Sequence, residues 1–254
     1  MDKNSSGEGM RIHWIDNLRG FAFINMVAYH LMFDLVWIFG FDIGWYKGST
    51  GYAWQQAICI TLIFISGISC AFGSHNIRRG VTILFCGMLM TAGTWLFMPD
   101  ELIVFGVLHF LGCARIIFGL LKKLLIRINE TAGFIIFILL FAVTKTVPDG
   151  ALGLWDKALF RLPRALYGTK LLFSAGLPHP SFSSADYFPL IPWIFLYFSG
   201  YFFWRILKKT GLEGRRLPSV APLAWVGRNS LLIYVLHQPV IYGILLLLNR
   251  LGIF

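Results

Sequence analysis

Residues 18–39 read LRGFAFINMVAYHLMFDLVWIF, and this stretch decides the class of fold. It has 22 residues and is apolar over most of its length. An α-helix of about 20 residues crosses the hydrocarbon core of a bilayer, so we predict that this stretch spans a membrane. Six further apolar stretches have a similar length: residues 52–72, 81–98, 102–121, 131–147, 188–207 and 224–248. The sequence therefore predicts an all-α polytopic membrane protein, with about seven transmembrane helices in one bundle and a single domain over residues 1–254.

The composition excludes other classes of protein. Of the 254 residues, 57% are hydrophobic and only 13% are charged. A soluble domain has about a quarter charged residues, so this chain cannot cover a water-facing surface. The four cysteines lie within apolar stretches and lack the spacing of a zinc site or a disulfide framework, so we expect no metal. A soluble globular protein, a disordered chain and a nucleic-acid-binding module are excluded.

The net charge of +10 reflects basic residues that lie mostly between the apolar stretches. Thirteen of the Lys and Arg residues fall on one side of the predicted bundle and seven on the other, and two lie within spans. Cytoplasmic connections retain Lys and Arg, so this asymmetry predicts a cytoplasmic amino-terminal segment at residues 1–17 and an external carboxyl terminus.

One connection is long, at residues 148–187 between the fifth and sixth predicted helices, and the orientation puts it outside. Its first part repeats apolar residues at the i, i+3, i+4 spacing of a helix with one apolar face. These residues are Leu154, Trp155, Ala158, Leu159 and Leu162. We predict an interfacial helix that lies on the outer leaflet.

The first span contains polar residues that are costly in hydrocarbon, namely Asn25, His30 and Asp34. Arg19 lies eleven residues before His30, which puts it roughly 16 Å lower on nearly the same helix face. Asp34 lies four residues after His30, one turn farther out, where a carboxylate can orient the imidazole. This arrangement favours a functional site over simple packing.

Two other spans carry histidines at a similar depth, His109 and His237, and two arginines lie toward the cytoplasm, Arg115 and Arg228. The pattern predicts guanidinium groups low in the bundle and imidazoles with a carboxylate higher up. A packing role stays open for at least one of the three histidines. Asn229 and Tyr234 are also able to join helices by hydrogen bonds.

This layering suits group transfer across a membrane. A histidine with a carboxylate partner acts as a general base on a hydroxyl or amine, and guanidinium groups bind phosphates bidentately. A coenzyme A thioester has the matching shape, because its charged nucleotide head carries a long, narrow arm. A cytoplasmic donor and an external acceptor would then meet at the histidines.

Five motifs in order resemble one known family. They are the run from Arg11 to Gly20 (RIHWIDNLRG) with the Asn25 and His30 region, then Phe64–Ser69 (FISGIS), Phe105–Gly112 (FGVLHFLG), Tyr187–Trp193 (YFPLIPW) and Gly227–Pro239 (GRNSLLIYVLHQP). Together they resemble the catalytic domain of the heparan-α-glucosaminide N-acetyltransferase family in its short bacterial form. The spacing of Arg19 and His30 is also similar to the signature of the acyltransferase-3 family, another group of transmembrane acyltransferases.

The resemblance implies a multi-pass enzyme of the bacterial cytoplasmic (inner) membrane that moves acetyl, or a short acyl group, from cytosolic acetyl-CoA to an acceptor outside. The acceptor would be a hydroxyl or amine, as on a sugar or glycan. The lysosomal relatives place their active histidine just after the first span, where residues 40–51 here hold no histidine. The acyltransferase-3 pattern then makes His30 the catalytic candidate.

These observations give each residue an expected role. His30 is the general base and Asp34 orients it, while Arg19, Arg115 and Arg228 bind the phosphates of acetyl-CoA. The expected channel for substrate is lined by Asn25, His109, Asn229, Tyr234 and His237.

Two other functions fit the same residues. A transporter or flippase for an anionic solute also uses buried arginines and histidines, although no internal repeat is evident. A non-catalytic assembly partner would use them only to join helices. Association into a homo-oligomer is left open.

Overall fold

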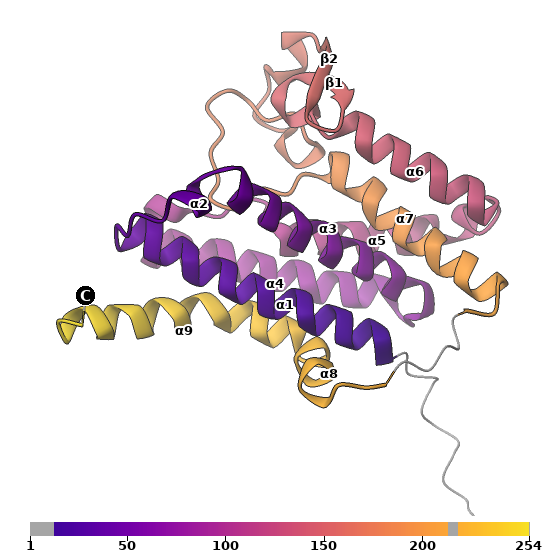
Figure 1. The fold of residues 1–254 in the computed structure, drawn as a ribbon. Helices are drawn as coiled ribbons and strands as arrows, with labels where there is room; N and C mark the ends of the chain where they lie inside the picture. Colours follow the sequence, from indigo (N-terminus) through magenta and orange to yellow (C-terminus); the bar gives the residue numbers. More distant parts are fainter. Residues whose placement is uncertain (1–12, 213–217, 254) are drawn as a thin grey trace, which may run out of the picture. The chain divides into compact units, whose positions relative to one another are not determined.

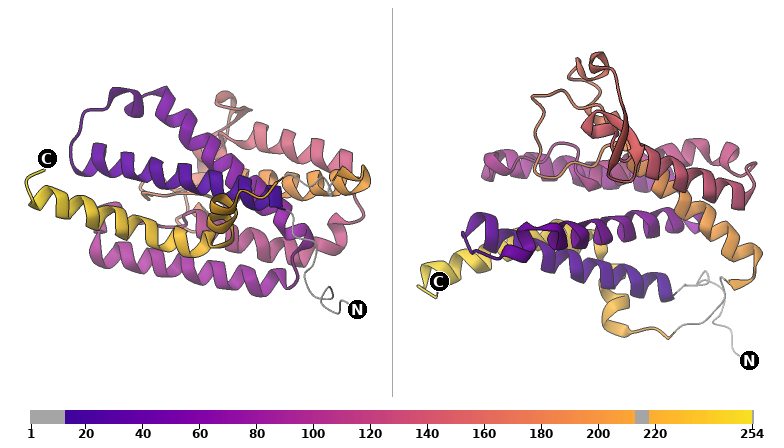
Figure 2. Two further views of the ribbon diagram at one scale, coloured as in Figure 1. Left: turned by 60° about the horizontal axis from the view of Figure 1, so that its bottom comes forward. Right: turned by 45° about the horizontal axis from the view of Figure 1, so that its top comes forward.

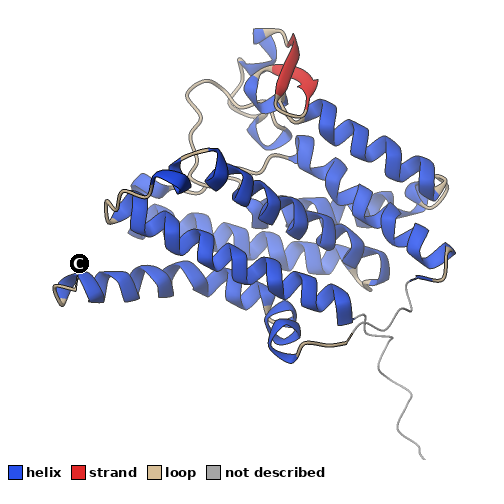
Figure 3. Ribbon diagram, in the orientation of Figure 1, coloured by secondary structure: helices blue, strands red, loops and turns tan. Residues whose placement is uncertain are grey.

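The computed structural model describes residues 13–212 and 218–253, and nearly all of its regular structure is helical (Figures 1 and 3). The chain forms two compact units. One unit joins Met1–Leu62 to Thr210–Phe254, and the other is Ile63–Lys209. Most of the predicted amino-terminal segment 1–17 lies outside the described residues.

Within the described residues, 6 helical segments are long and apolar enough to cross a membrane. They are Trp14–Ile38, Ser49–Phe72, Asn76–Phe97, Glu130–Asp149, Leu190–Lys209 and Ser230–Arg250. The remaining predicted span, 102–121, corresponds to helix α5 (Val107–Leu125), a shorter helix of 19 residues with basic side chains in its last turn. The prediction of a polytopic helical membrane protein is confirmed.

In the first unit, α1 (His13–Phe33) runs into a π-helical turn, η1 (Asp34–Ile38), and is followed by the short helix α2 (Gly44–Lys47) and the first part of α3 (Ser49–Phe72). The carboxyl-terminal helices α8 (Ala221–Arg228) and α9 (Ser230–Arg250) both contact α1. Both views in Figure 2 show α9, in yellow, beside α1, in indigo.

Glycine allows the backbones of α1 and α8 to touch. A Cβ atom on Gly20 would lie 2.0 Å from the carbonyl oxygen of Leu223, and one on Gly227 would lie 2.2 Å from that of Asp16. Without a hydrophobic driving force between helices in lipid, such close approach supplies the packing energy. The two glycines therefore fix α8 against the beginning of α1.

The last predicted span, 224–248, is not one helix. The chain breaks at Asn229, whose φ of −95° and ψ of 19° separate α8 from α9. The Asn229 side chain donates to the carbonyl oxygen of Trp225 at 2.9 Å. Asparagine competes for backbone hydrogen bonds and disfavours helix interiors, and the neighbouring Gly227 adds to that effect.

The second unit contains the rest of α3, then α4 (Asn76–Phe97), α5, α6 (Glu130–Thr144) and α7 (Leu190–Lys209). Helices α4 and α5 form one antiparallel pair, and α6 and α7 form another. Two pairs of glycines line the α4–α5 contact, and the members of each pair are seven residues apart: Gly80 with Gly87 in α4, and Gly112 with Gly119 in α5. A Cβ atom on any of these four glycines would lie within about 3 Å of atoms of the facing helix. Four short 3-10 helices complete the unit: η2 (Pro99–Glu101), η3 (Val147–Asp149), η4 (Arg164–Tyr167) and η5 (Phe173–Ala175).

The prediction of an interfacial helix in residues 148–187 is wrong. The segment forms an antiparallel hairpin of β1 (Ala151–Leu154) and β2 (Lys157–Arg161), drawn in red at the end of α6 in Figure 3. Only 12 residues lie between Gly150 and Pro163, so a helix in this part of the segment would be short. An isolated helix of fewer than about 12–15 residues is only marginally stable.

Contacts with α6 decide the conformation of this hairpin. At its two-residue turn, Trp155 has a φ of 59° and donates its backbone N–H to the carbonyl oxygen of Ala142 at 2.8 Å. Asp156, the other turn residue, forms an ion pair with Lys145. The Lys145 ammonium also lies 4.7 Å from the centre of the Trp155 ring. Tertiary contacts therefore override the helical spacing of the apolar residues.

The contact between α3 and α7 gives a stability prediction. A Cβ atom on Gly67 would lie 1.9 Å from the carbonyl oxygen of Tyr197, which is itself buried. We expect Gly67→Ala to lower the free energy of unfolding by about 1–3 kcal/mol, because the backbones of α3 and α7 must move apart to make room for the added methyl group. Thermal unfolding in detergent measures this change.

Gly93→Ala is the matched control, since a Cβ atom at this α4 position meets nothing within 4 Å. We expect that variant to be neutral or slightly stabilised by its better helix propensity. Equal melting temperatures for both variants would contradict the tight α3–α7 contact.

Candidate active site

Two histidines from distant parts of the sequence meet in the first unit. The ring centroids of His30 in α1 and His237 in α9 lie 4.7 Å apart, with the ring planes at 80°. His30 Nδ1 donates to the carbonyl oxygen of Met26 at 2.9 Å, and His237 Nδ1 donates to that of Tyr234 at 2.6 Å. A carbonyl oxygen only accepts, so each neutral ring carries its proton on Nδ1 and its lone pair on Nε2.

The second nitrogen of His237 is available for chemistry. The residue is buried, and its Nε2 atom has no hydrogen-bond partner. A buried nitrogen with a lone pair and no donor is costly unless a ligand or water supplies one. The Nε2 atom of His237 is therefore a basic nitrogen inside the first unit, the kind of atom that proton abstraction requires.

A buried carboxylate lies one turn farther along α1. Asp34 is 0% exposed, and its Oδ1 atom accepts a hydrogen bond of 2.6 Å from the Gln238 side-chain amide. Gln238 directly follows His237, so this bond ties α1 to α9 next to the histidine contact. The sequence-based analysis missed Gln238, although an amide in the middle of an otherwise apolar span was a signal that it has a partner.

Aromatic side chains close one side of His30. The Tyr29 ring contacts the rings of His30, Tyr46 and Trp54 at centroid distances of 6.0, 5.0 and 5.4 Å. The Tyr46 hydroxyl donates to the Tyr29 carbonyl oxygen at 3.1 Å, and burial raises the pKa of Tyr46. Tyr46 therefore stays protonated and holds the loop after the first span against α1.

The predicted channel residues of the first unit have different surroundings. The Tyr234 ring lies 5.4 Å from the His237 ring, and it packs against an apolar cluster that contains Phe23. Asn25 accepts a hydrogen bond of 3.2 Å from the Trp54 indole and donates to its own helix. The structure thus brings Tyr234 to the histidines, whereas Asn25 joins α1 to α3 and Asn229 caps α8.

The predicted phosphate-binding arginines of the first unit lie on the two helices that contact each other near the beginning of α1. Arg19 is half-buried and forms an ion pair with Asp16 at 3.4 Å. Arg228 is the last residue of α8 and is exposed.

Two predicted site residues belong to the second unit. His109 packs against the backbone of Gly87, stacks on the Phe105 ring at 5.9 Å and lies 3.4 Å from the Thr91 hydroxyl. These contacts account for His109 by packing within α4 and α5. His109 belongs to the second unit and the other two histidines to the first, so the joint role predicted for the three stays a prediction.

Arg115 has a preformed support. Its Nε atom donates to the side-chain oxygen of Asn76 at 3.1 Å. Asn76 is buried and in turn donates to the carbonyl oxygens of Cys70 and Gly73 at 3.1 and 3.2 Å. This chain of bonds fixes the guanidinium at the amino-terminal end of α4, a second feature that the sequence-based analysis missed.

A family model matches residues 11–239, and its description is heparan-alpha-glucosaminide N-acetyltransferase, catalytic. The chain belongs to this family. The match covers the second unit, reaches into both parts of the first, and contains every candidate site residue named above. Comparison with curated proteins gives no match, and neither does comparison with solved structures. Membership of the family and the apolar helices make the chain a multi-pass membrane protein of an acetyltransferase family.

The bond between Asp34 and Gln238 gives a second stability prediction. We expect Gln238→Leu to lower the free energy of unfolding by about 1–3 kcal/mol, because it removes a donor from a buried carboxylate. Denaturant titration of the detergent-solubilised protein measures the loss. Gln55→Leu, the same change in α3 of the first unit, is the control.

A double variant tests the cause. Replacing both partners, with Asp34→Leu and Gln238→Leu together, should cost less than the sum of the single changes, since no buried polar group is then left behind. Additive losses would show that the two side chains do not interact.

Proposed function

We propose that this protein transfers acetyl, or a short acyl group, from cytosolic acetyl-CoA to a hydroxyl or amine of an extracytoplasmic acceptor. His30 acts as the general base. The observation that carries this proposal is the contact of His30 with His237 at 4.7 Å, next to the buried Asp34. Family membership supports the acetyl group as the unit transferred.

In the proposed transfer, one proton moves from the acceptor to His30 and from there to the leaving thiolate. The Nε2 atom of His30 takes the proton from the acceptor hydroxyl or amine as that oxygen or nitrogen bonds to the acetyl carbon. The carbon–sulfur bond of the thioester then breaks, and the leaving thiolate takes the proton back from the imidazolium. Asp34, one helical turn from His30, stabilises the positive charge that the ring carries in between.

The arginines supply the donor site in this proposal. Guanidinium groups bind phosphate oxygens bidentately, and Asn76 holds the Arg115 group in a fixed orientation. Arg19 and Arg228 are the other two residues that we propose for binding phosphates of acetyl-CoA. Acetyl-CoA would bind from the cytoplasmic side, which agrees with the excess of basic residues in the connections assigned to the cytoplasm.

The acceptor side follows from the same orientation. Asp34 and the π-helical turn lie toward the outer end of the first span, so an acceptor would reach His30 from outside. We place the protein in the bacterial cytoplasmic membrane, with a sugar or glycan as the acceptor. Tyr234 and His237 would line the acceptor's path.

Loss of the base is the main test of function. Purified protein in lipid vesicles, supplied with radiolabelled acetyl-CoA, should cleave the thioester and label an acceptor. We expect His30→Ala to lower the turnover number by about 10²–10⁴-fold, because it removes the general base. His179→Ala, a change in the loop that precedes α7 in the second unit, should retain full turnover.

Two results would decide against this function. Normal turnover by the His30→Ala variant would exclude the proposed base. Movement of an anionic solute across the vesicle membrane without thioester cleavage would identify a transporter instead.

The donor site gives an independent prediction. We expect Arg115→Met to raise the KM for acetyl-CoA by about 10–100-fold, the equivalent of one charge-assisted hydrogen bond, with little change in the KM for the acceptor. Arg127→Met is the control, because Arg127 is exposed in the connection after α5. Equal KM values for the two variants would remove Arg115 from the donor site.

A further inference from the structure

The β-hairpin of the second unit has one buried face and one exposed face. Ala151 and Gly153 of β1 are buried, and β1 contacts α6. Leu154 and its cross-strand partner Lys157 project from the other face, as does Phe160. Leu154 is 56% exposed and Phe160 is 71% exposed. Large apolar side chains therefore point away from the core of the unit.

A β-bulge puts Phe160 on the exposed face. Gly153 pairs with Ala158, whereas Leu152 pairs with Phe160, so Leu159 is an extra residue in the second strand. With strict alternation, Phe160 would project from the buried face that Gly153 and Ala158 share. Leu159 is itself 66% exposed. The bulge thus enlarges the apolar surface of the hairpin.

The hairpin lies at the end of a span. It begins at Ala151, two residues after the apolar span Glu130–Asp149 ends. Its turn folds back along that span, because the Trp155 N–H donates to the carbonyl oxygen of Ala142 at 2.8 Å and the Trp155 ring contacts the Phe141 ring at 6.1 Å. Tryptophan is enriched at the boundary between hydrocarbon and water. The length of the span puts the hairpin at the same boundary.

The hairpin and the chain after it are basic. Four exposed basic side chains lie here: Lys157, Arg161, Arg164 and Lys170. Residues 157–185 contain no Asp or Glu. The carboxylate at the turn, Asp156, forms its ion pair with Lys145. No carboxylate of the described residues forms an ion pair with any of the four, so the protein leaves their charge uncompensated.

Hydrogen bonds hold the chain after β2 at the base of the hairpin. The backbone N–H of Leu162 donates to the carbonyl oxygen of Gly150 at 2.8 Å. The Tyr167 hydroxyl donates to the carbonyl oxygen of Val147. These bonds keep β2 and η4 near the end of the span, so the two arginines of this stretch belong to the same surface as the hairpin.

Membrane orientation does not account for these basic residues. Cytoplasmic connections retain Lys and Arg, and the excess on the predicted cytoplasmic side follows that rule. The connection 148–187 is predicted to lie outside, where basic residues run against the rule. An anionic lipid surface gives them a role, because each basic residue near such a surface strengthens binding by about fivefold.

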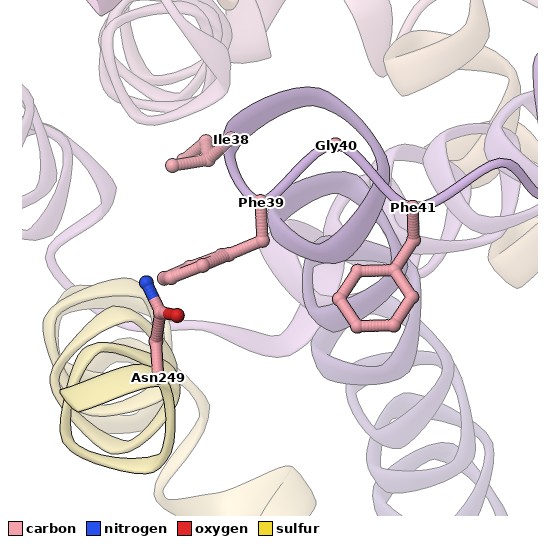
Figure 4. A pocket seen from close by; sticks show the side chains of 5 residues that line it. All are labelled: Ile38, Phe39, Gly40, Phe41 and Asn249. Atoms are coloured by element: carbon pink, nitrogen blue, oxygen red, sulfur yellow. The ribbon is translucent and has the colours of Figure 1, made fainter. Parts of the chain in front are cut away.

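Apolar surface without charge does not select an anionic lipid. One pocket of the first unit is lined by Ile38, Phe39, Gly40, Phe41 and Asn249 (Figure 4). None of these five side chains is charged. On the hairpin, in contrast, a lysine stands on the same face as a leucine and a phenylalanine. Basic and apolar side chains together are typical of surfaces that bind anionic membranes.

We propose that the hairpin binds the phosphate headgroups of anionic lipids. Leu154, Leu159 and Phe160 enter the boundary of the acyl chains, and Lys157 and Arg161 extend to the headgroups. This contact anchors the connection between α6 and α7 to the membrane surface. A soluble polyanion fits less well, because the exposed apolar side chains would stay in water. The inference does not depend on the proposed transfer reaction.

Exchange of backbone amide hydrogens measures the contact locally. The full-length protein is placed in nanodiscs of phosphatidylcholine, or of phosphatidylcholine and phosphatidylglycerol in equal amounts, and hydrogen–deuterium exchange is followed by mass spectrometry. We expect the amides of residues 157–162 to exchange at least about fivefold more slowly when phosphatidylglycerol is present. Equal exchange in the two lipids would overturn the proposal.

Charge variants test which residues are responsible. Lys157→Gln with Arg161→Gln should remove the difference between the lipids, whereas the charge-conserving pair Lys157→Arg with Arg161→Lys should keep it. Lys123→Gln with Arg127→Gln is the matched control, because it removes the same charge from exposed positions at the end of α5. This control should keep the difference too. A difference that survives the loss of both hairpin charges would overturn the proposal.

Folding of the hairpin is checked in the same experiment. Fast exchange of residues 157–162 in phosphatidylcholine alone would show that a variant has unfolded the hairpin. In that event Arg164→Gln with Lys170→Gln, two changes outside the strands, takes the place of the first pair. We expect this variant to reduce the effect of phosphatidylglycerol by at least about fivefold, and an undiminished effect would overturn the proposal.

Soluble anions are the competing partners. Inorganic phosphate and dextran sulfate, each added to the phosphatidylcholine nanodiscs, should leave the exchange of residues 157–162 unchanged. Slower exchange with inorganic phosphate would identify a site for a free anion, and slower exchange with dextran sulfate a site for a polyanion. Either result would overturn the assignment to lipid.

Discussion

The hydrogen bond between the buried carboxylate of Asp34 and the amide of Gln238 is the constraint on which the first unit depends. A carboxylate in an apolar interior is costly, so it persists only where a partner supplies a hydrogen bond. This partner comes from the other end of the chain. Because His30 precedes Asp34 by one turn and His237 precedes Gln238 by one residue, the same bond fixes the two imidazoles against each other.

Close backbone contact provides most of the remaining specificity. Gly20 and Gly227 hold α1 and α8 together in the first unit, and Gly67 lets α3 touch α7 in the second. Lipid does not drive helices together as water does, so the fit of backbone against backbone selects the partners. Hydrogen bonds between polar side chains then fix the register of neighbouring helices, as the bond from Arg115 to Asn76 does for α5 and α4.

The sequence was sufficient for the class of fold and for part of the candidate site. Apolar length predicted the spans, and the cost of an imidazole and a carboxylate in hydrocarbon singled out His30 and Asp34. Partners far apart in sequence were out of reach: the amide of Gln238 becomes meaningful only when α9 lies beside α1. The β-hairpin was missed because Trp155 and Asp156 are held by α6 rather than by local periodicity. Hydropathy predicted one continuous span over residues 224–248, whereas the structure divides it at Asn229 into α8 and α9.

The π-helical turn at Asp34–Ile38 has a consequence for how such a site varies. A wider turn holds one residue more than an α-helical turn, so it rotates everything beyond it about the helix axis. Insertion or loss of that single residue would re-aim Phe39 and Phe41 while His30, which comes before it, kept its direction. The turn therefore allows the side chains beyond it to change direction while the helix face that carries His30 stays the same.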